Sequence, residues 1–330
     1  MTPIRWAALL AAPLLAGATD PAPPPVPPPA PVSDDVVPFI QPFDLDATQR
    51  MAVAVTVDGQ GPFSFLVDTG AERTVIAREL AERLGLTQGA KLRLATIGSL
   101  VTAPSYRVAA LRMSDLRLAS LEAPAFAGRH IGAAGLIGID MLKNRRVLID
   151  FRRQSMEILA SRQQVRPIIR DQDAIIVMAR NRAGRLILSD ARIDGRRVDV
   201  IVDTGAQASI GNLALQRLVA ERHAYQGPFS PAILGAVSGE DVPAVRTAIK
   251  RVTIADVHVS NLSVSFADSR AFTALGLDDR PALLLGMDAL ALFDRVEIDF
   301  PNRRVIFDMP SGAARDAGQR LAANAAIGRL

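Results

Sequence analysis

The sequence contains no cysteine among its 330 residues. This absence excludes a disulfide framework, thiolate metal sites, iron–sulfur clusters and a cysteine nucleophile. Histidine is scarce as well: His130, His223 and His258 are scattered along the chain and offer no histidine-rich metal centre. The sequence therefore predicts neither a metal nor a cofactor.

A large net charge is also lacking, because 38 Lys and Arg face 34 Asp and Glu, for a formal net charge of +4. Only three of the basic residues are lysines, so the sequence pI near 10.0 reflects the very high pKa of arginine. The arginine pairs are dispersed among strand-like segments and no basic run is interleaved with aromatics. This pattern predicts a solvated surface and no nucleic-acid partner.

The N-terminal segment lacks an apolar run long enough to cross a bilayer. Residues 1–18 resemble a signal peptide, with Arg5 before an apolar run from Trp6 to Leu15 and small residues at a cleavage site. The run is about ten residues, short of the roughly 20 that span a membrane, so we expect no stable membrane span in the mature chain. We expect export to the periplasm or the medium, a proline-rich linker over residues 19–47, and an Ala/Arg-rich tail over residues 311–330.

From about Thr48 onward, the apolar pattern is that of β-structure. Short runs rich in Val, Ile and Leu end at Gly, Asp-Gly or Pro, as Met51 to Val57 does before Asp58-Gly59. Helical patterning is scarce, and its best examples are Ala77 to Leu84 and Leu213 to Glu221. The sequence predicts a mainly β fold.

The chain also repeats itself. The run Val67-Asp68-Thr69-Gly70-Ala71 recurs as Val202-Asp203-Thr204-Gly205-Ala206. Other blocks recur in the same order: Asp58-Gly59 with Asp194-Gly195, Leu136-Ile137-Gly138 with Leu284-Leu285-Gly286, and Ile149-Asp150-Phe151 with Ile298-Asp299-Phe300. This order predicts a tandem duplication, with a first repeat over residues 48–166 and a second over residues 167–310.

Each repeat places one carboxylate at the end of an apolar strand, followed by Thr-Gly in a tight turn. If the halves pack about a pseudo-two-fold axis, Asp68 and Asp203 meet there and share a proton, because two carboxylates in contact cannot both ionise cheaply. A water between them then faces a base and an acid together, which suits attack on an amide carbonyl. The residues expected to support this catalytic pair are Thr69, Gly70, Ala71, Thr204, Gly205 and Ala206.

At these residues the sequence resembles the retropepsin-like aspartic proteases, in a single-chain form that carries both Asp-Thr-Gly-Ala copies. The resemblance implies two closed β-barrel halves related by a pseudo-two-fold axis, with a cleft between them for a peptide or protein substrate. It also implies a monomer and hairpin flaps over the cleft. The candidate flap tips are Ile97, Gly98 and Ser99 in the first repeat and Val237, Ser238 and Gly239 in the second.

The sequence departs from the retroviral pattern after each motif, where Glu72-Arg73 and Gln207-Ala208 replace a pair of acids that holds the substrate backbone. This difference leaves the substrate preference open. A non-catalytic peptide-binding module on the same fold is the main alternative, and a paired-carboxylate glycosidase is a second. The repeated carboxylates Asp140, Asp288, Asp150 and Asp299 fit structural roles as helix caps or ion-pair partners.

The residue after each motif glycine is Ala71 or Ala206, where pepsin-type enzymes place a hydroxyl. Without that hydrogen bond to the ionised form, the pKa of the pair is expected to be higher. The sequence therefore predicts a pH optimum in the weakly acidic to neutral range.

Overall fold

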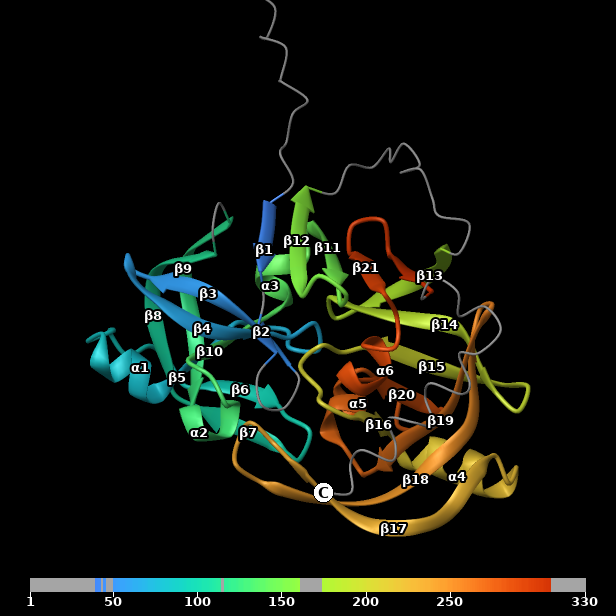
Figure 1. The fold of residues 1–330 in the computed structure, drawn as a ribbon. Coiled ribbons are helices and arrows are strands. Elements are labelled where there is room, and N and C mark those ends of the chain that lie inside the picture. Colours follow the sequence, from blue (N-terminus) through green and yellow to red (C-terminus); the bar gives the residue numbers. More distant parts are fainter. Residues whose placement is uncertain (1–38, 43, 46–49, 114–115, 161–173, 310–330) are drawn as a thin grey trace, which may run out of the picture. The chain divides into compact units, whose positions relative to one another are not determined.

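Strands dominate the computed structural model, which describes residues 39–42, 44–45, 50–113, 116–160 and 174–309. Figure 1 shows their arrangement. The expected signal peptide, most of the linker, the C-terminal tail and the boundary between the repeats lie outside the described residues. No helix in the described part of the chain is both long and apolar enough to cross a membrane.

The first half carries twelve described strands and three short helices. The strands are β1 (Phe39–Pro42), β2 (Asp44–Leu45), β3 (Met51–Val57), β4 (Gln60–Val67), β5 (Val75–Ala77), β6 (Leu92–Ala95), β7 (Leu100–Ala103), β8 (Ser105–Met113), β9 (Leu116–Phe126), β10 (Gly135–Ile137), β11 (Arg145–Asp150) and β12 (Ser155–Ala160). The helices are α1 (Arg78–Arg83), α2 (Gly128–Ile131) and α3 (Ile139–Leu142).

The second half repeats this plan. Its strands are β13 (Ala174–Arg182), β14 (Arg185–Ile193), β15 (Arg196–Val202), β16 (Ser209–Gly211), β17 (Tyr225–Gly235), β18 (Asp241–Ile254), β19 (Val257–Phe266), β20 (Ala282–Leu285), β21 (Arg295–Asp299) and β22 (Arg304–Asp308). Its helices are α4 (Leu213–Glu221), α5 (Arg270–Ala274) and α6 (Met287–Leu290).

Six strands of the first half close into a barrel. Their order is β3-β4-β10-β5-β9-β8, and β8 pairs back with β3. In the second half the order β14-β15-β20-β16-β19-β18 corresponds strand for strand, and β14 pairs with β18. The predicted mainly β fold with two equivalent halves is therefore confirmed.

The Asp-Gly pairs form the turns that the sequence predicts. Asp58 and Gly59 have φ values of 48° and 79°, and Asp194 and Gly195 have values of 48° and 75°. Two consecutive residues with positive φ make a type I′ turn, whose twist matches that of the flanking strands. These turns fix the register of β3 with β4 and of β14 with β15.

A second set of strands joins the halves in the order β1-β12-β11-β21-β22-β13. At its centre β11 and β21 run antiparallel, and Leu148 lies opposite Glu297. These two residues are also equivalent in the duplication, so the pseudo-two-fold axis passes beside them.

Burial raises the pKa of Glu297, whose carboxylate lies 3.6 Å from an Arg146 nitrogen and 4.0 Å from one of Arg304.

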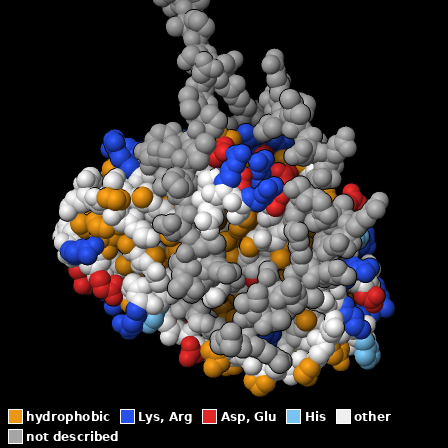
Figure 2. All heavy atoms as spheres, in the orientation of Figure 1, with side chains coloured by type: hydrophobic (Ala, Val, Ile, Leu, Met, Phe, Trp, Pro, Cys, Tyr) orange, Lys and Arg blue, Asp and Glu red, His pale blue; other side chains and the backbone are white. Residues whose placement is uncertain are grey.

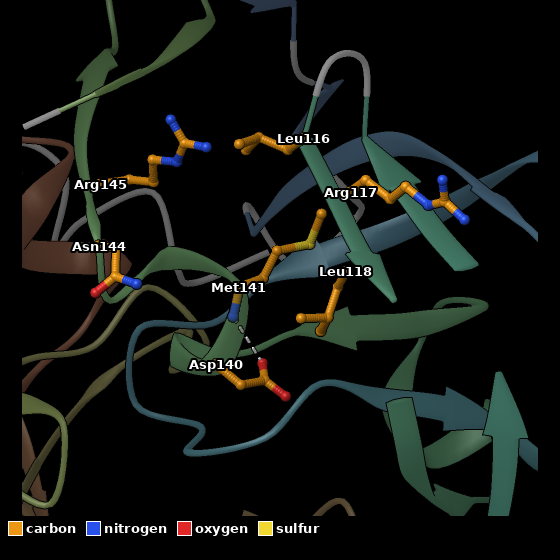
Figure 3. A pocket seen from close by; sticks show the side chains of 7 residues that line it. All are labelled: Leu116, Arg117, Leu118, Asp140, Met141, Asn144 and Arg145. Carbon is orange, nitrogen blue, oxygen red and sulfur yellow. Dashed lines mark hydrogen bonds between the residues drawn. The ribbon is translucent and has the colours of Figure 1, made fainter. Parts of the chain in front are cut away.

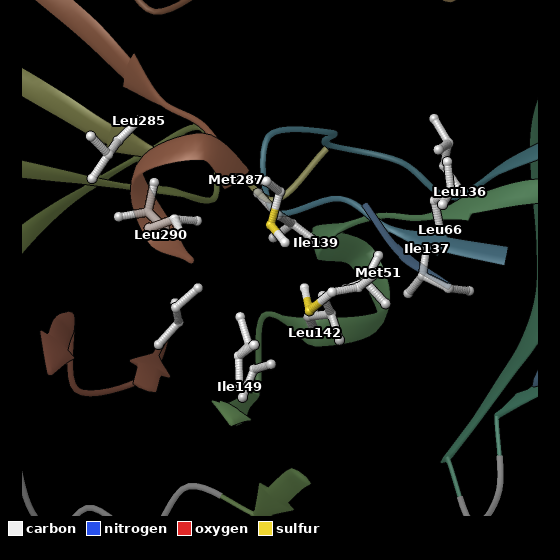
Figure 4. Packing of buried hydrophobic residues seen from close by; sticks show 14 of the residues in the cluster. Met51, Leu66, Leu136, Ile137, Ile139, Leu142, Ile149, Leu285, Met287 and Leu290 are labelled. Carbon is white, nitrogen blue, oxygen red and sulfur yellow. The ribbon is translucent and has the colours of Figure 1, made fainter. Parts of the chain in front are cut away.

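One hydrophobic cluster extends across both halves. Figure 4 shows part of it, with Met51, Ile137 and Leu142 from the first half and Leu285, Met287 and Leu290 from the second. All of these side chains are buried. The shared core gives the two Asp-Thr-Gly-Ala loops a common support, because both helices that follow the Gly138 and Gly286 segments contribute to it.

Lys and Arg side chains are spread over several separate places on the face shown in Figure 2, with Asp or Glu beside some of them. Several described arginines form ion pairs: Asp199 lies 2.8 Å from Arg180 and 3.7 Å from Arg280, and Arg152 lies 3.2 Å from Asp294. Such exposed pairs contribute about 0–1 kcal/mol each to the free energy of unfolding. The positive charge on the face shown in Figure 2 is therefore spread over separate places and partly neutralised by neighbouring carboxylates.

Candidate active site

Each candidate catalytic Asp follows the last residue of a buried strand. Asp68 comes after Val67 of β4, and Asp203 comes after Val202 of β15. Their backbone N–H groups donate to Ile137 O at 2.9 Å and Leu285 O at 3.0 Å. These bonds tie each active-site loop, residues 68–71 or 203–206, to the neighbouring parallel strand.

The two loops meet at their glycines. A Cβ at Gly70 would overlap the carboxylate of Asp203, and a Cβ at Gly205 would overlap the carboxylate of Asp68. Only a residue without a side chain allows this approach. The structure thus brings together the two carboxylates that the sequence predicts to lie side by side.

Two threonines fasten the loops to each other. Thr69 N–H donates to Thr204 Oγ1 at 3.1 Å, and Thr204 N–H donates to Thr69 Oγ1, also at 3.1 Å. Each hydroxyl then donates to a carbonyl in the opposite half, Thr69 to Val202 O at 3.0 Å and Thr204 to Val67 O at 2.8 Å. Both side chains are buried, so all four bonds are protected from water.

Each carboxylate uses one oxygen to cap its own loop. Asp68 Oδ1 accepts from the N–H groups of Gly70 and Ala71, both at 2.8 Å. Asp203 Oδ1 accepts from Gly205 at 2.9 Å and from Ala206 at 3.3 Å. These bonds orient both carboxyl groups before any substrate arrives.

The pKa values of both carboxyls are raised, and burial is the main cause. The negative charge of Asp68 adds to this effect and brings the pKa of Asp203 to about 7. The loop N–H groups act in the opposite direction because they stabilise the charged forms. Such a pair holds a single proton over a wide pH range.

Arg185 is a charged residue at this site that the sequence analysis does not identify. It begins β14 in the second half, and its Nε donates to Gly70 O in the first half at 2.6 Å. Its charge lowers the pKa of both Asp68 and Asp203. A signal does exist in the sequence, since Arg50 and Arg185 each precede their half's Asp by 18 residues.

A further layer of residues supports the loops in the same way in each half. Thr74 Oγ1 donates to Asp140 at 2.6 Å and accepts from Gly138 N–H at 3.1 Å. In the second half, Ser209 Oγ donates to Asp288 at 2.8 Å and accepts from Gly286 N–H at 3.1 Å. These carboxylates therefore hold the segment beneath each loop.

The other repeated carboxylates also have structural contacts. Asp150 Oδ2 accepts from Arg295 Nε at 3.0 Å, and Asp299 Oδ2 accepts from Arg304 Nε at 3.2 Å. Both contacts lie in the strands that join the halves, away from the active-site loops.

Residues 53–141 and 189–289 match the family described as Aspartyl protease, once in each half and over more than half of the chain. The chain belongs to the aspartyl protease family. Each matched stretch contains one Asp-Thr-Gly-Ala loop and ends in the short helix beneath it, α3 or α6. No curated protein matches the sequence.

This member of the aspartyl protease family carries hairpins at both predicted flap positions. β6 and β7 are joined at residues 96–99, where Thr96 N–H donates to Ser99 O at 2.9 Å. β17 and β18 are joined at residues 236–240, where Gly239 N–H donates to Ala236 O at 2.9 Å. All six candidate tip residues lie in these turns, namely Ile97, Gly98, Ser99, Val237, Ser238 and Gly239.

The two hairpin tips contact each other. Ser99 Oγ lies 2.8 Å from both carboxylate oxygens of Glu240, and Gly98 approaches the same side chain. Gly239 of the second tip also lies against the ring of His130, in α2 of the first half. The second hairpin therefore rests on two separate elements of the first half.

A pocket of about 230 Å³ lies elsewhere in the first half. Figure 3 shows its lining residues, Leu116, Arg117, Leu118, Asp140, Met141, Asn144 and Arg145. Asp140 accepts there from Met141 N–H at 3.0 Å and from Thr74 Oγ1 at 2.6 Å, so its oxygens hold the segment beneath the Asp68 loop. Among the described residues, no three His, Asp or Glu side chains are grouped as metal ligands.

Proposed function

We propose that the protein is an exported aspartic endopeptidase that cleaves peptide bonds with a water activated by Asp68 and Asp203. The observation that supports this most is the approach of the two carboxylates across the glycines of the two loops. The chain's membership of the aspartyl protease family and the proton that the two carboxyls are expected to share support the same chemistry. Export rests on the sequence of residues 1–18, and the peptide substrate rests on the family.

The proposed reaction moves two protons between the carboxyls and the peptide. The ionised carboxylate takes a proton from water as the water oxygen attacks the amide carbon, and the protonated carboxyl donates to the carbonyl oxygen. The resulting gem-diol collapses when the carboxyl that took the water proton donates it to the amide nitrogen, the other carboxylate takes a proton from a gem-diol hydroxyl, and the C–N bond breaks, giving a carboxylic acid and an amine. The charge of Asp68 raises the pKa of Asp203, which favours Asp203 as the proton donor in this first step.

The raised pKa values also support a pH range. Because the pKa of Asp203 is brought to about 7, the singly protonated pair persists into the neutral range. We expect kcat/KM to follow a bell-shaped profile centred at weakly acidic to neutral pH. Its limbs belong to the coupled pair and not to either residue alone.

The test is cleavage of a peptide library by the wild-type protein and by Asp68→Asn, Asp203→Asn and the double variant. Each single variant should lose at least about a thousandfold in kcat/KM with its fold intact, and the double variant should lose no more, because the two groups act as a unit. Asp256→Asn, an exposed turn residue, is the matched control and should keep full activity. Substantial activity in either single variant would refute the mechanism.

We propose that the active species is a monomer, because one chain supplies both loops. Mixing Asp68→Asn protein with Asp203→Asn protein should then restore no activity. If activity returns on mixing, the halves pair between chains.

A further inference from the structure

Arg185 reaches the active site from an element that is docked on the opposite half. The turn between β13 and β14 consists of Ala183 and Gly184, with φ values of 49° and 82°. Gly184 N–H donates to Asn181 Oδ1 at 3.1 Å, and a Cβ at Gly184 would lie 3.2 Å from Ile139 Cγ2 in α3. The turn thus rests on the first half, and Arg185 is the next residue in the chain.

The carbonyl that Arg185 holds belongs to the loop that orients Asp68. Arg185 Nε donates to Gly70 O at 2.6 Å, while Gly70 N–H donates to Asp68 Oδ1 at 2.8 Å. The next residue, Ala71, is fixed on its other side, since Ile139 N–H donates to Ala71 O at 2.9 Å. The loop is therefore held by its own half at Ala71 and by the second half at Gly70.

We propose that Arg185 is a positioning residue for the proposed peptidase reaction: it fixes the Asp68 loop through Gly70 O and keeps a permanent positive charge beside the two carboxyls. The inference rests on the proposed function for its kinetic consequences. Arginine suits this task because its planar Nε–H has a fixed direction and its charge does not titrate in the working pH range.

The charged groups with the strongest influence on the pair are the partner carboxyl and Arg185. Asp68 acts on Asp203 as a like charge, and Asp203 acts on Asp68 through a hydrogen bond. Arg185 opposes burial at both residues. Removing its charge should therefore raise the pKa of both carboxyls and move both limbs of the pH profile to higher pH.

The experiment compares Arg185→Gln with Arg185→Lys. Arg185→Gln removes the charge and the fixed donor, so we expect kcat to fall about ten- to a hundredfold with little change in KM, and both limbs to move upward. Arg185→Lys keeps the charge without the planar donor, so its limbs should stay near the wild-type positions while kcat still falls. If Arg185→Gln does not fold at the assay temperature, Arg185→Lys decides the positioning role by its kcat.

The matched control is Arg50→Gln, which removes the repeat-equivalent arginine. Arg50 Nη2 donates to Ile131 O in its own half at 3.0 Å. This variant should change thermal stability but leave the limbs of the pH profile in place. The proposal is overturned if Arg50→Gln moves the limbs as Arg185→Gln does, or if Arg185→Gln changes neither kcat nor the limbs. It is also overturned if Arg185→Gln raises KM alone, which would make Arg185 a substrate contact.

A readout without substrate separates this inference from the proposed function. NMR titration of protein labelled with ¹³C at the aspartate carboxyls reports the apparent pKa values of the pair directly. These values should be higher in Arg185→Gln than in the wild type. If the wild type cleaves no peptide, the proposed function fails while this titration still tests Arg185; unchanged values would refute the charge effect.

Discussion

The two halves of the molecule agree closely at the pseudo-two-fold axis and differ away from it. At the pseudo-two-fold axis the reciprocal threonine bonds are both 3.1 Å long, and each loop glycine faces the other half's carboxylate. Away from the axis, the first hairpin has strands of four residues each, whereas β17 and β18 have 11 and 14. The N-caps of equivalent helices differ as well, because the side chain of Asn212 bonds to α4 whereas Ala77 caps α1 without a side-chain bond.

The difference shows which part of the duplication is constrained. A change at the axis disturbs both halves at once, because each loop supplies the bonding partners of the other. A change at the periphery affects one half, so loops there can lengthen independently. The segment between α2 and β10 has three residues, while that between α5 and β20 has seven.

The largest expected effect on stability concerns Asn212, which holds the longer segment between α5 and β20. Asn212 is the N-cap residue of α4 and is buried. Its Oδ1 accepts from Leu215 N–H and Ala282 N–H, and its Nδ2 donates to Leu277 O and Arg280 O, both at 2.7 Å. Asn212→Ala leaves these groups without partners and should lower the free energy of unfolding by about 3 kcal/mol. Urea denaturation measures this loss.

Ser269→Ala is the matched control for the Asn212 variant. Ser269 is a buried cap of α5 that makes one bond of 3.3 Å, to Ala271 N–H, so its loss should cost about 0.5–1 kcal/mol. In the first half, the residue equivalent to Asn212 is Ala77, which caps α1 with no side-chain bond, and the residue equivalent to Ser269 is Ala127, which caps α2 with none either. If the two variants lose the same free energy of unfolding, the additional bonds of Asn212 do not contribute to stability.

The second prediction compares the two carboxyls. Burial and the charge of Asp68 raise the pKa of Asp203 from 3.8 to about 7, so the folded state holds its proton more tightly than the unfolded state does. The wild type should therefore lose stability as the pH rises from about 4 to about 7. Asp203→Asn removes this loss and should raise Tm by several degrees at pH 8, with a gain that disappears toward pH 4.

Asp68→Asn should give a smaller gain, because Asp68 is partly exposed and Asp203 is buried, at 9% exposure. Thermal unfolding of both variants between pH 4 and pH 8 measures the difference. A pH-independent difference in Tm between Asp203→Asn and the wild type would contradict the assignment of a raised pKa to this residue.

The parts of the site that were predictable from the sequence depend on neighbouring residues. Asp58-Gly59 and Asp194-Gly195 specify type I′ turns by themselves, and the repeated motif indicates which loops must meet. The flap hairpins were expected from the resemblance to the retropepsin-like proteases, and their candidate tips were placed on short segments of consecutive residues. In each case the residues that determine the structure are adjacent in the chain.

The parts that were not predictable depend on register between distant segments. Strands β11 and β21 join the halves through residues such as Val147 and Ile298, whose alternating pattern would suit many partners. Arg185 reaches Gly70 only because the turn before it rests on Ile139, a contact between the halves that no local pattern indicates. The duplication points to Arg50 and Arg185 as equivalent arginines, but it does not show which groups either one contacts.

The smallest expected effect lies at the hairpin tips, where the two halves meet away from the axis. Ser99→Ala removes the exposed bond to Glu240 and should raise KM for a peptide about two- to fivefold with kcat nearly unchanged, because such a bond contributes about 0.5–1 kcal/mol. Glu240→Ala should have the same effect, whereas Glu240→Gln keeps an acceptor and should have less. Since both single variants break one contact, the double variant Ser99→Ala/Glu240→Ala should raise KM no further than either alone. Additive increases in KM would show that the hairpins act separately on the substrate, and the asymmetry between a short and a long hairpin would then extend to their function.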